Sequence, residues 1–252
     1  MRIHLPYKAV AGIAIGALLV AGVSAWMAWP AYHQYKLVDP KMDGFVQPRS
    51  IANLVRKAQL STVTIYCYDT KDTYSQGSGW STTLKIEKDK EFPTAIVTNY
   101  HVIEDCLNND GTLKKDSLTI TKLNGTKEWP AIVYNFDAEN DLAIIRTKAD
   151  VNPLKMAPSM PYAGYWVMAV GTADGYEGSV AFGNVLNITD TDILITANIS
   201  HGNSGGPLLD NEGNVIGTNT FRSKLEQYNG AKSLDAMCEV FIECGGKYYW
   251  EP

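Results

Sequence analysis

Residues 202–220 read GNSGGPLLDNEGNVIGTNT. Two short strand-like runs lie in this stretch, PLL at 207–209 and VIGTNT at 215–220, and Asp, Asn and Gly separate them. Runs of this length that end at such turn-forming residues are typical of β-strands. The stretch therefore predicts two strands joined by a turn.

The same pattern recurs over most of the chain before this stretch. The runs are rich in Val, Ile, Thr and Tyr, and Gly, Asn and Asp interrupt them. They cover residues 62–68, 95–98, 117–123, 131–134, 142–146, 165–170, 185–189 and 193–197. Many short strands with regular turns favour a sandwich or a barrel over alternating strands and helices. The predicted fold class is all-β.

A short helix is expected directly before the first of these strands. Ser50 can cap its start. Apolar residues follow at the spacing of one helical face, namely Ile51, Leu54, Val55 and Ala58. We therefore expect an amphipathic helix that packs one face on the strands.

The end of the chain allows two interpretations. Residues 234–242 fit a helical face, whereas residues 236–242 fit a closing strand equally well. The segment 223–252 is too short for another domain, so we expect it to close the domain before it.

Composition excludes several classes of protein. Hydrophobic residues make up 45% of the 252 residues and charged residues 19%, and the 21 glycines and 11 prolines follow no period. These values argue against a collagen and against gross disorder. The net charge is -5, and no long run of Lys or Arg is present. A nucleic-acid partner is therefore not expected.

Residues 9–29 form an uncharged stretch about as long as the roughly 20 helical residues that cross a bilayer. Arg2 and Lys8 precede it, which favours a cytoplasmic tail at 1–8 and a domain outside the cytoplasm. Three prolines in residues 30–49 indicate a stalk. The sequence thus predicts a single-pass membrane anchor.

A cleaved signal peptide is the alternative for the same residues. Val23, Ser24 and Ala25 resemble the small-residue site at which such peptides are cut. The domain would then be secreted. Both interpretations place it outside the cytoplasm.

Four cysteines suit an exported protein and allow three pairings. We expect a bridge between Cys67 and Cys106. Cys238 and Cys244 would lie roughly 9 Å apart in one continuous helix, beyond the roughly 7 Å limit, so their pairing needs a break between them. No CxxC spacing occurs, and no metal site is predicted.

Three residues stand out as a possible catalytic set. Of the four histidines, His4 and His33 lie outside the expected domain, which leaves His101 and His201 as candidate bases. His101 ends an apolar strand in AIVTNYHVIED, and Asp141 begins the apolar run DLAIIR. Either residue alone is more often structural.

Ser204 carries the most specific signal, because glycines on both sides let the backbone adopt tight or left-handed conformations. A serine hydroxyl becomes a nucleophile when a base takes its proton and a carboxylate orients that base. His101, Asp141 and Ser204 supply these three parts. The N–H groups of Gly202 and Ser204 could stabilise the oxyanion that forms.

At these residues the sequence resembles the trypsin-like serine proteases, most closely the HtrA (Deg) branch. The resemblance runs from about residue 51 to 220 and includes IANLVRKAQLSTVTIY, QGSGW, TNYHV, FDAENDLAII, VMAVGTADGYEGSVAFGNV and GNSGGPLLDNEGNVIGTNT. It implies two packed six-stranded β-barrels, about 50–149 and 150–222, with the active site between them. It also implies a serine endopeptidase without metal or organic cofactor, in which His101 is the base, Asp141 orients it and Ser204 attacks.

The sequence departs from this branch in two respects. Members usually carry PDZ modules after the protease domain; none is expected here, and their regulation is not carried over. The family often has Pro where this chain has His201. We expect Asn198, His201 and Thr218 to contact substrate. No acidic residue lies in 198–203, so we expect a small or medium apolar residue before the cut.

The expected partners are protein or peptide substrates, together with a membrane through residues 9–29. The oligomeric state stays open. Two further hypotheses remain beside the endopeptidase: a protease-fold sensor that a partner activates, and a scaffold at the membrane whose role does not need Ser204.

Overall fold

The computed structural model describes residues 43–69, 73–84, 89–222, 228–238, 241–242 and 249–250. The chain divides into two units, Met1–Asp43 and Gly44–Pro252. The predicted tail at 1–8 and the predicted anchor or signal segment at 9–29 lie outside the described residues. Within the described ranges, no helix has the length and apolar character needed to cross a bilayer.

In the described ranges of the second unit there are one α-helix, twelve strands and three short 3₁₀ helices. In chain order they are α2 (Ile51–Ser61), β1 (Thr62–Tyr68), β2 (Tyr74–Ser81), β3 (Thr94–Thr98), η1 (Tyr100–Val102), η2 (Glu104–Cys106), β4 (Leu118–Lys122), β5 (Trp129–Asp137), β6 (Leu142–Thr147), β7 (Trp166–Ala173), β8 (Tyr176–Ile188), β9 (Asp192–Ile195), β10 (Pro207–Leu209), β11 (Val215–Arg222), β12 (Asn229–Ser233) and η3 (Asp235–Met237).

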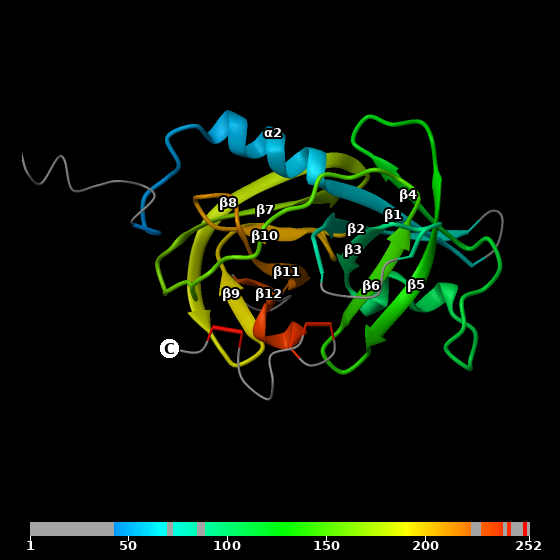
Figure 1. Cartoon of the computed structure of the whole chain (residues 1–252). Coiled ribbons are helices and arrows are strands. Elements are labelled where there is room, and N and C mark those ends of the chain that lie inside the picture. Colours follow the sequence, from blue (N-terminus) through cyan, green and yellow to red (C-terminus); the bar gives the residue numbers. More distant parts are fainter. Residues whose placement is uncertain are drawn as a thin grey trace, which may run out of the picture. The chain divides into compact units, whose positions relative to one another are not determined.

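The twelve strands form two closed antiparallel barrels. The first has the order β1-β2-β3-β6-β5-β4 and the second β10-β11-β12-β9-β8-β7. Figure 1 shows them side by side, with the cyan and green strands in the first barrel and the yellow and orange strands in the second. Closure leaves neither sheet with an open edge. The predicted all-β class and the two six-stranded barrels are confirmed.

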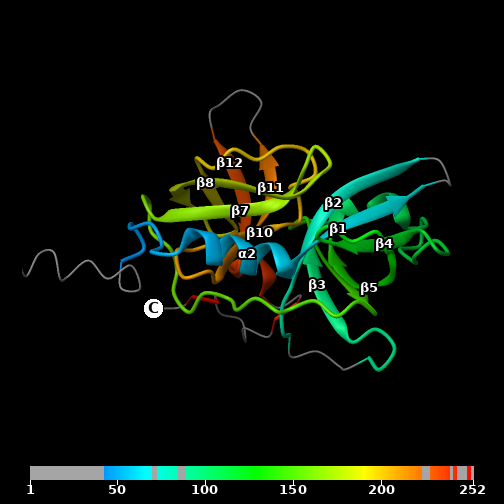
Figure 2. The ribbon, with the colours of Figure 1, turned by 90° about the horizontal axis from the view of Figure 1, so that it is seen from above.

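The predicted helix is confirmed as α2, which leads directly into β1 (Figure 2). Ala58 and Ser61 are buried, and Leu54 and Val55 pack against the core of the second barrel. Ser50 occupies the N-cap position, but its side chain makes no capping hydrogen bond. Burial of one face therefore accounts for the helix better than the expected cap does.

Most expected strands are present, but the sequence pattern did not predict two of the observed strands. They are β2 and β12, whose sequences YSQGSGWS and NGAKS contain mainly small and polar residues. Because β12 pairs with β9 and β11, the second barrel extends past the expected boundary at 222. Beyond residue 222, the described part of the tail is neither one helix nor one strand. η3 forms a single turn, and the backbone of Cys238 then pairs with Ile242 in an isolated β-bridge.

The last residues of the expected stalk belong to the barrel unit. Gly44 O accepts a hydrogen bond from Trp166 N–H at 2.8 Å, and the Phe45 ring packs edge-on against Tyr165. Val46 O accepts from Asn211 Nδ2 at 2.8 Å. The stalk prediction is therefore wrong for these residues, because they pair with the second barrel.

Cys67 and Cys106 form the expected disulfide, with their Cα atoms 5.5 Å apart. The bridge fastens η2 to β1, and both residues are fully buried in the first barrel. Cys238 is also disulfide-bonded, whereas Cys244 lies outside the described residues. The break between these two cysteines that the sequence required stays a prediction.

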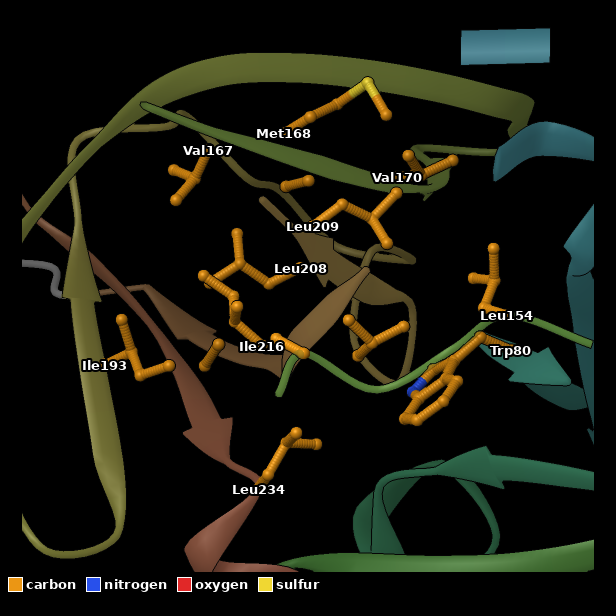
Figure 3. Close-up of a cluster of buried hydrophobic side chains, with 14 of the residues drawn as sticks. Trp80, Leu154, Val167, Met168, Val170, Ile193, Leu208, Leu209, Ile216 and Leu234 are labelled. Atoms are coloured by element: carbon orange, nitrogen blue, oxygen red, sulfur yellow. The ribbon is translucent and has the colours of Figure 1, made fainter. Parts of the chain in front are cut away.

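The largest buried cluster spans both barrels. Figure 3 shows Trp80, which comes from β2, at the edge of the apolar side chains of the second barrel. Trp80 is fully buried, and its Nε1 donates to Thr218 Oγ1 on β11 at 3.1 Å. Trp80 is thus one of several side chains of the first barrel that share a core with the second.

Replacing Trp80 with Ala should lower the free energy of unfolding by about 3–5 kcal/mol, because it opens a cavity between the barrels. Trp80→Phe keeps a ring but removes the donor to Thr218, and should cost less. Leu186→Ala, at a side chain 45% exposed, is the control. Urea unfolding followed by circular dichroism measures all three, and equal losses in Trp80→Ala and Leu186→Ala would contradict the assignment.

Replacing both Cys67 and Cys106 with Ala should lower the free energy of unfolding by about 2–5 kcal/mol, because the bridge constrains the unfolded chain. Reductant should destabilise the wild type by a similar amount through this bridge. Thermal unfolding with and without dithiothreitol checks this. A double variant as stable as the oxidised wild type would refute it.

Candidate active site

His101 and Asp141 are in direct contact at the end of the first barrel. His101 lies in η1, directly after β3, and its Nδ1 is 3.0 Å from Asp141 Oδ1 and 2.8 Å from Oδ2. Its backbone N–H also donates to Oδ1, at 3.0 Å. An ionised carboxylate only accepts hydrogen bonds, so Nδ1 carries the proton in this pair. In the neutral imidazole, Nε2 is then an acceptor.

A tight turn presents Asp141 to this histidine. Asp137 Oδ1 accepts the N–H groups of Glu139 and Asn140, which folds the chain back before β6. Asp141 itself has a φ of 51°, a left-handed conformation that Asp tolerates better than most residues. The carboxylate is 24% exposed and the imidazole 41% exposed. The pair is therefore open to solvent on one side.

Ser204 lies on a second turn, between β9 and β10. Asn203 N–H donates to Ser200 O and Gly206 N–H donates to Asn203 O. Gly202 and Gly205 have φ values of 89° and 84°. Any Cβ at Gly205 would also collide with the backbone of Ser78. The expected need for glycines around the serine is therefore met by conformation and by space.

The two turns meet at the boundary between the barrels. A Cβ on Gly77 would lie 2.6 Å from Val102 Cγ1, next to His101, and 3.2 Å from Ser204 O. Within the described residues, Ser204 Oγ donates to Thr220 O at 3.3 Å and makes no hydrogen bond to the imidazole. The structure therefore joins His101 to Asp141 and brings the serine turn beside them, with the hydroxyl directed at β11.

Asn99 links the carboxylate turn to β11 and was not identified from the sequence. Its Nδ2 donates to Asp141 O at 2.7 Å and to Thr220 Oγ1 at 2.6 Å. It is fully buried, and both partners are acceptors, which fixes the orientation of the amide. A polar residue directly after an apolar strand, as in TNYHV, is the signal that could have revealed it.

Two backbone N–H groups near Ser204 have no protein acceptor. In the part of the chain that the structure describes, neither Gly202 N–H nor Ser204 N–H donates to another residue. By contrast, Asn203 N–H donates to Ser200 O, and Gly205 N–H donates to Asn219 O at 2.8 Å. Gly202 and Ser204 are the two residues that the sequence nominates as donors to an oxyanion.

The residues expected to contact substrate differ in exposure. Asn198 and His201 are exposed on the segment that leads to Ser204. Thr218 is fully buried, and its hydroxyl accepts from Trp80. Its side chain therefore packs between the barrels and not on an open wall. Across the described ranges, no cluster of three or more His, Cys, Asp or Glu side chains suited to a metal ion is found.

Replacing Asn99 with Asp should lower the free energy of unfolding by about 3 kcal/mol or more at neutral pH, because a buried carboxylate would face the Asp141 carbonyl, which can only accept. Burial raises the pKa of such a carboxyl, so the variant should be most stable at low pH and lose stability as the pH rises.

Asn184→Asp is the matched control for this change. Asn184 is exposed and donates one hydrogen bond, to Gly164 O at 2.9 Å. Urea unfolding at pH 4 and pH 7 compares the two variants. Equal losses at both positions would contradict the proposed importance of the buried amide.

A family profile described as a trypsin-like peptidase domain matches residues 77–217, more than half of the chain. The chain is 36% identical over 136 residues to a "Probable periplasmic serine endoprotease DegP-like" of Chlamydia pneumoniae, covering 50% of this chain and 26% of that protein. It is 32% identical over 142 residues to "Protease Do-like 5, chloroplastic" of Arabidopsis thaliana, covering 50% of this chain and 44% of that protein.

The chain thus spans less than half the length of these two relatives. Among solved structures, the serine endoprotease from Yersinia pestis is similar, with a TM-score of 0.61 and 24% identity over 75% of this chain and 64% of that one. This likeness supports the fold. The profile match shows that the chain belongs to the family of trypsin-like peptidase domains, and the relatives that it resembles are named as DegP-like and Do-like proteases.

Proposed function

We propose that the chain is a serine endopeptidase that hydrolyses peptide bonds of protein substrates outside the cytoplasm. The contact between His101 Nδ1 and Asp141, beside a serine turn with two unpaired N–H groups, carries the proposal. Family membership and the names of the relatives support it.

In the proposed reaction His101 is the general base and Asp141 holds its tautomer. Ser204 Oγ attacks the carbonyl carbon while Nε2 takes the hydroxyl proton, which Nε2 then gives to the leaving amine as the C–N bond breaks. Water then attacks the acyl-enzyme while Nε2 takes its proton. The ester C–O bond breaks, and Nε2 returns the proton to Ser204 Oγ. The exposed face of the imidazole leaves room for a substrate.

Before the attack, the Ser204 hydroxyl must break its hydrogen bond to Thr220 O. In the structure it donates to that carbonyl at 3.3 Å, a long and therefore weak bond. Rotation about χ1 to another staggered position can redirect Oγ without moving the backbone. The proposed attack therefore requires the Ser204 side chain to rotate away from Thr220 O.

Gly202 N–H and Ser204 N–H would stabilise the oxyanion in this reaction. Donors that are already in place gain strength where water is excluded and need no rearrangement during the step. The absence of competing protein acceptors within the described segment 200–206 supports this role.

Location and substrate preference are parts of the same proposal. The Chlamydia relative has "periplasmic" in its name, and residues 9–29 fit a membrane anchor or a signal peptide. Asn198 and His201 are exposed beside the serine turn and would contact the residue before the cut. With no acidic side chain in 198–203, a small or medium apolar residue fits best there.

A fluorophosphonate probe should label the full chain at Ser204, and labelled casein should be cleaved. Ser204→Ala should abolish labelling and lower kcat by about 10⁴-fold or more, because the nucleophile is lost. Ser200→Ala is the matched control, since only the backbone of Ser200 holds the turn. Equal labelling of wild type and Ser204→Ala would defeat the proposal.

The sensor hypothesis predicts a different outcome of this experiment. A purified chain that stays silent until a peptide or protein partner is added would favour a partner-activated sensor. Cleavage of casein without any partner would count against it.

A further inference from the structure

Ser78 makes an unusually complete set of contacts with the serine turn. It lies in QGSGW on β2, in the first barrel, and is fully buried. Its N–H donates to Ser204 O at 2.8 Å, and its Oγ donates to Gly202 O at 2.6 Å. The same Oγ accepts Thr172 N–H at 2.9 Å. The three partner groups of Ser78 are backbone atoms of the second barrel. Ser78 therefore contacts the backbone of Ser204 but no side chain of the proposed triad.

These contacts restrain Gly202 from one side, and another contact restrains it from the other. The preceding carbonyl, His201 O, accepts Asp174 N–H at 2.7 Å. A peptide unit is planar, so fixing this carbonyl also fixes the direction of Gly202 N–H. Gly202 has no Cβ and a φ of 89°, so without such restraints its backbone could rotate freely. On the carbonyl side, Gly202 O accepts the Ser78 hydroxyl at 2.6 Å and Thr172 N–H at 3.4 Å, so the shorter restraint comes from Ser78.

The surrounding residues leave space for this contact and for little else. A Cβ on Gly171 would lie 3.0 Å from Ser78 Oγ and 2.6 Å from Asn203 Oδ1. Ser78 O accepts Thr98 Oγ1 at 2.7 Å, which ties this residue to the strand that leads to His101. A hydroxyl is needed at this position, because it must accept one hydrogen bond and donate another.

We propose that Ser78 is a positioning residue for the proposed reaction: its hydroxyl holds the Gly202 carbonyl so that Gly202 N–H and Ser204 N–H converge on the oxygen of the attacked carbonyl. The inference rests on the proposed endopeptidase function. Ser78 touches no substrate and acts only through the loop at 200–206.

Replacing Ser78 with Ala should lower kcat on labelled casein by about 10–100-fold and leave KM within about threefold. The predicted loss lies below the roughly 10²–10³-fold cost of removing an oxyanion donor, because the donors remain but are no longer held. A peptide aldehyde ending in valine, whose adduct places an oxyanion at the same donors, should bind more weakly by a similar factor. The corresponding peptide alcohol, which forms no oxyanion, should bind Ser78→Ala as tightly as it binds the wild type.

Ser81→Ala is the matched control, since it makes the same change on the same strand. Ser81 is also buried and donates one hydrogen bond, to Val151 O at 3.2 Å, away from the loop. It should leave kcat unchanged. Ser78→Cys retains a weak donor and should give an intermediate kcat, which keeps the test open if Ser78→Ala folds poorly. A kcat in Ser78→Ala equal to that of Ser81→Ala would overturn the inference.

Hydrogen exchange of the segment 199–206, measured by mass spectrometry, separates this inference from the proposed function. Exchange should accelerate in Ser78→Ala but not in Ser81→Ala, whether or not the chain cleaves protein. Unchanged exchange in Ser78→Ala would refute the positioning role. A wild type that neither binds the fluorophosphonate nor cleaves casein, but shows the expected exchange, would refute only the endopeptidase.

Discussion

The side-chain amide of Asn99 is the contact on which the site depends. It bonds to the carbonyl of Asp141 in the first barrel and to the hydroxyl of Thr220 in the second. Both bonds are inside the protein, where hydrogen bonds are strong when complete and costly when broken. One buried residue therefore ties the carboxylate turn of the first barrel to β11 of the second, the strand whose Thr220 carbonyl accepts the Ser204 hydroxyl.

The two barrels contribute different residues to the candidate site. The first supplies the imidazole and carboxylate, which stay partly exposed on short turns. The second supplies the serine on a loop that contains two left-handed glycines. β2 reaches the second barrel at two residues, because Trp80 joins its core and Ser78 bonds to two carbonyls of the loop. A strand of one barrel thus supports the loop that carries the serine of the other.

Much of this arrangement could be predicted from the sequence, and the exceptions have physical causes. Runs such as IIR and TVTIY indicate strands because β-branched side chains suit a pleated surface. The strands β2 and β12 carry small and polar residues, and are strands because their neighbours pair with them. Local pattern does not reveal such pairing. Thr218 follows an apolar run and was predicted to contact substrate, but its hydroxyl accepts a hydrogen bond from the buried Trp80 side chain. Asn99 was missed because its partners lie 42 and 121 positions away.

The docking of Gly44 on β7 places two separate contacts on one strand. Trp166, the first residue of β7, donates its N–H to Gly44 O, while Thr172 near the other end of the strand donates to Ser78. β7 thus carries the contact with Gly44 at one end and the contact with Ser78 at the other. A shift in the register of this one strand would displace both contacts together.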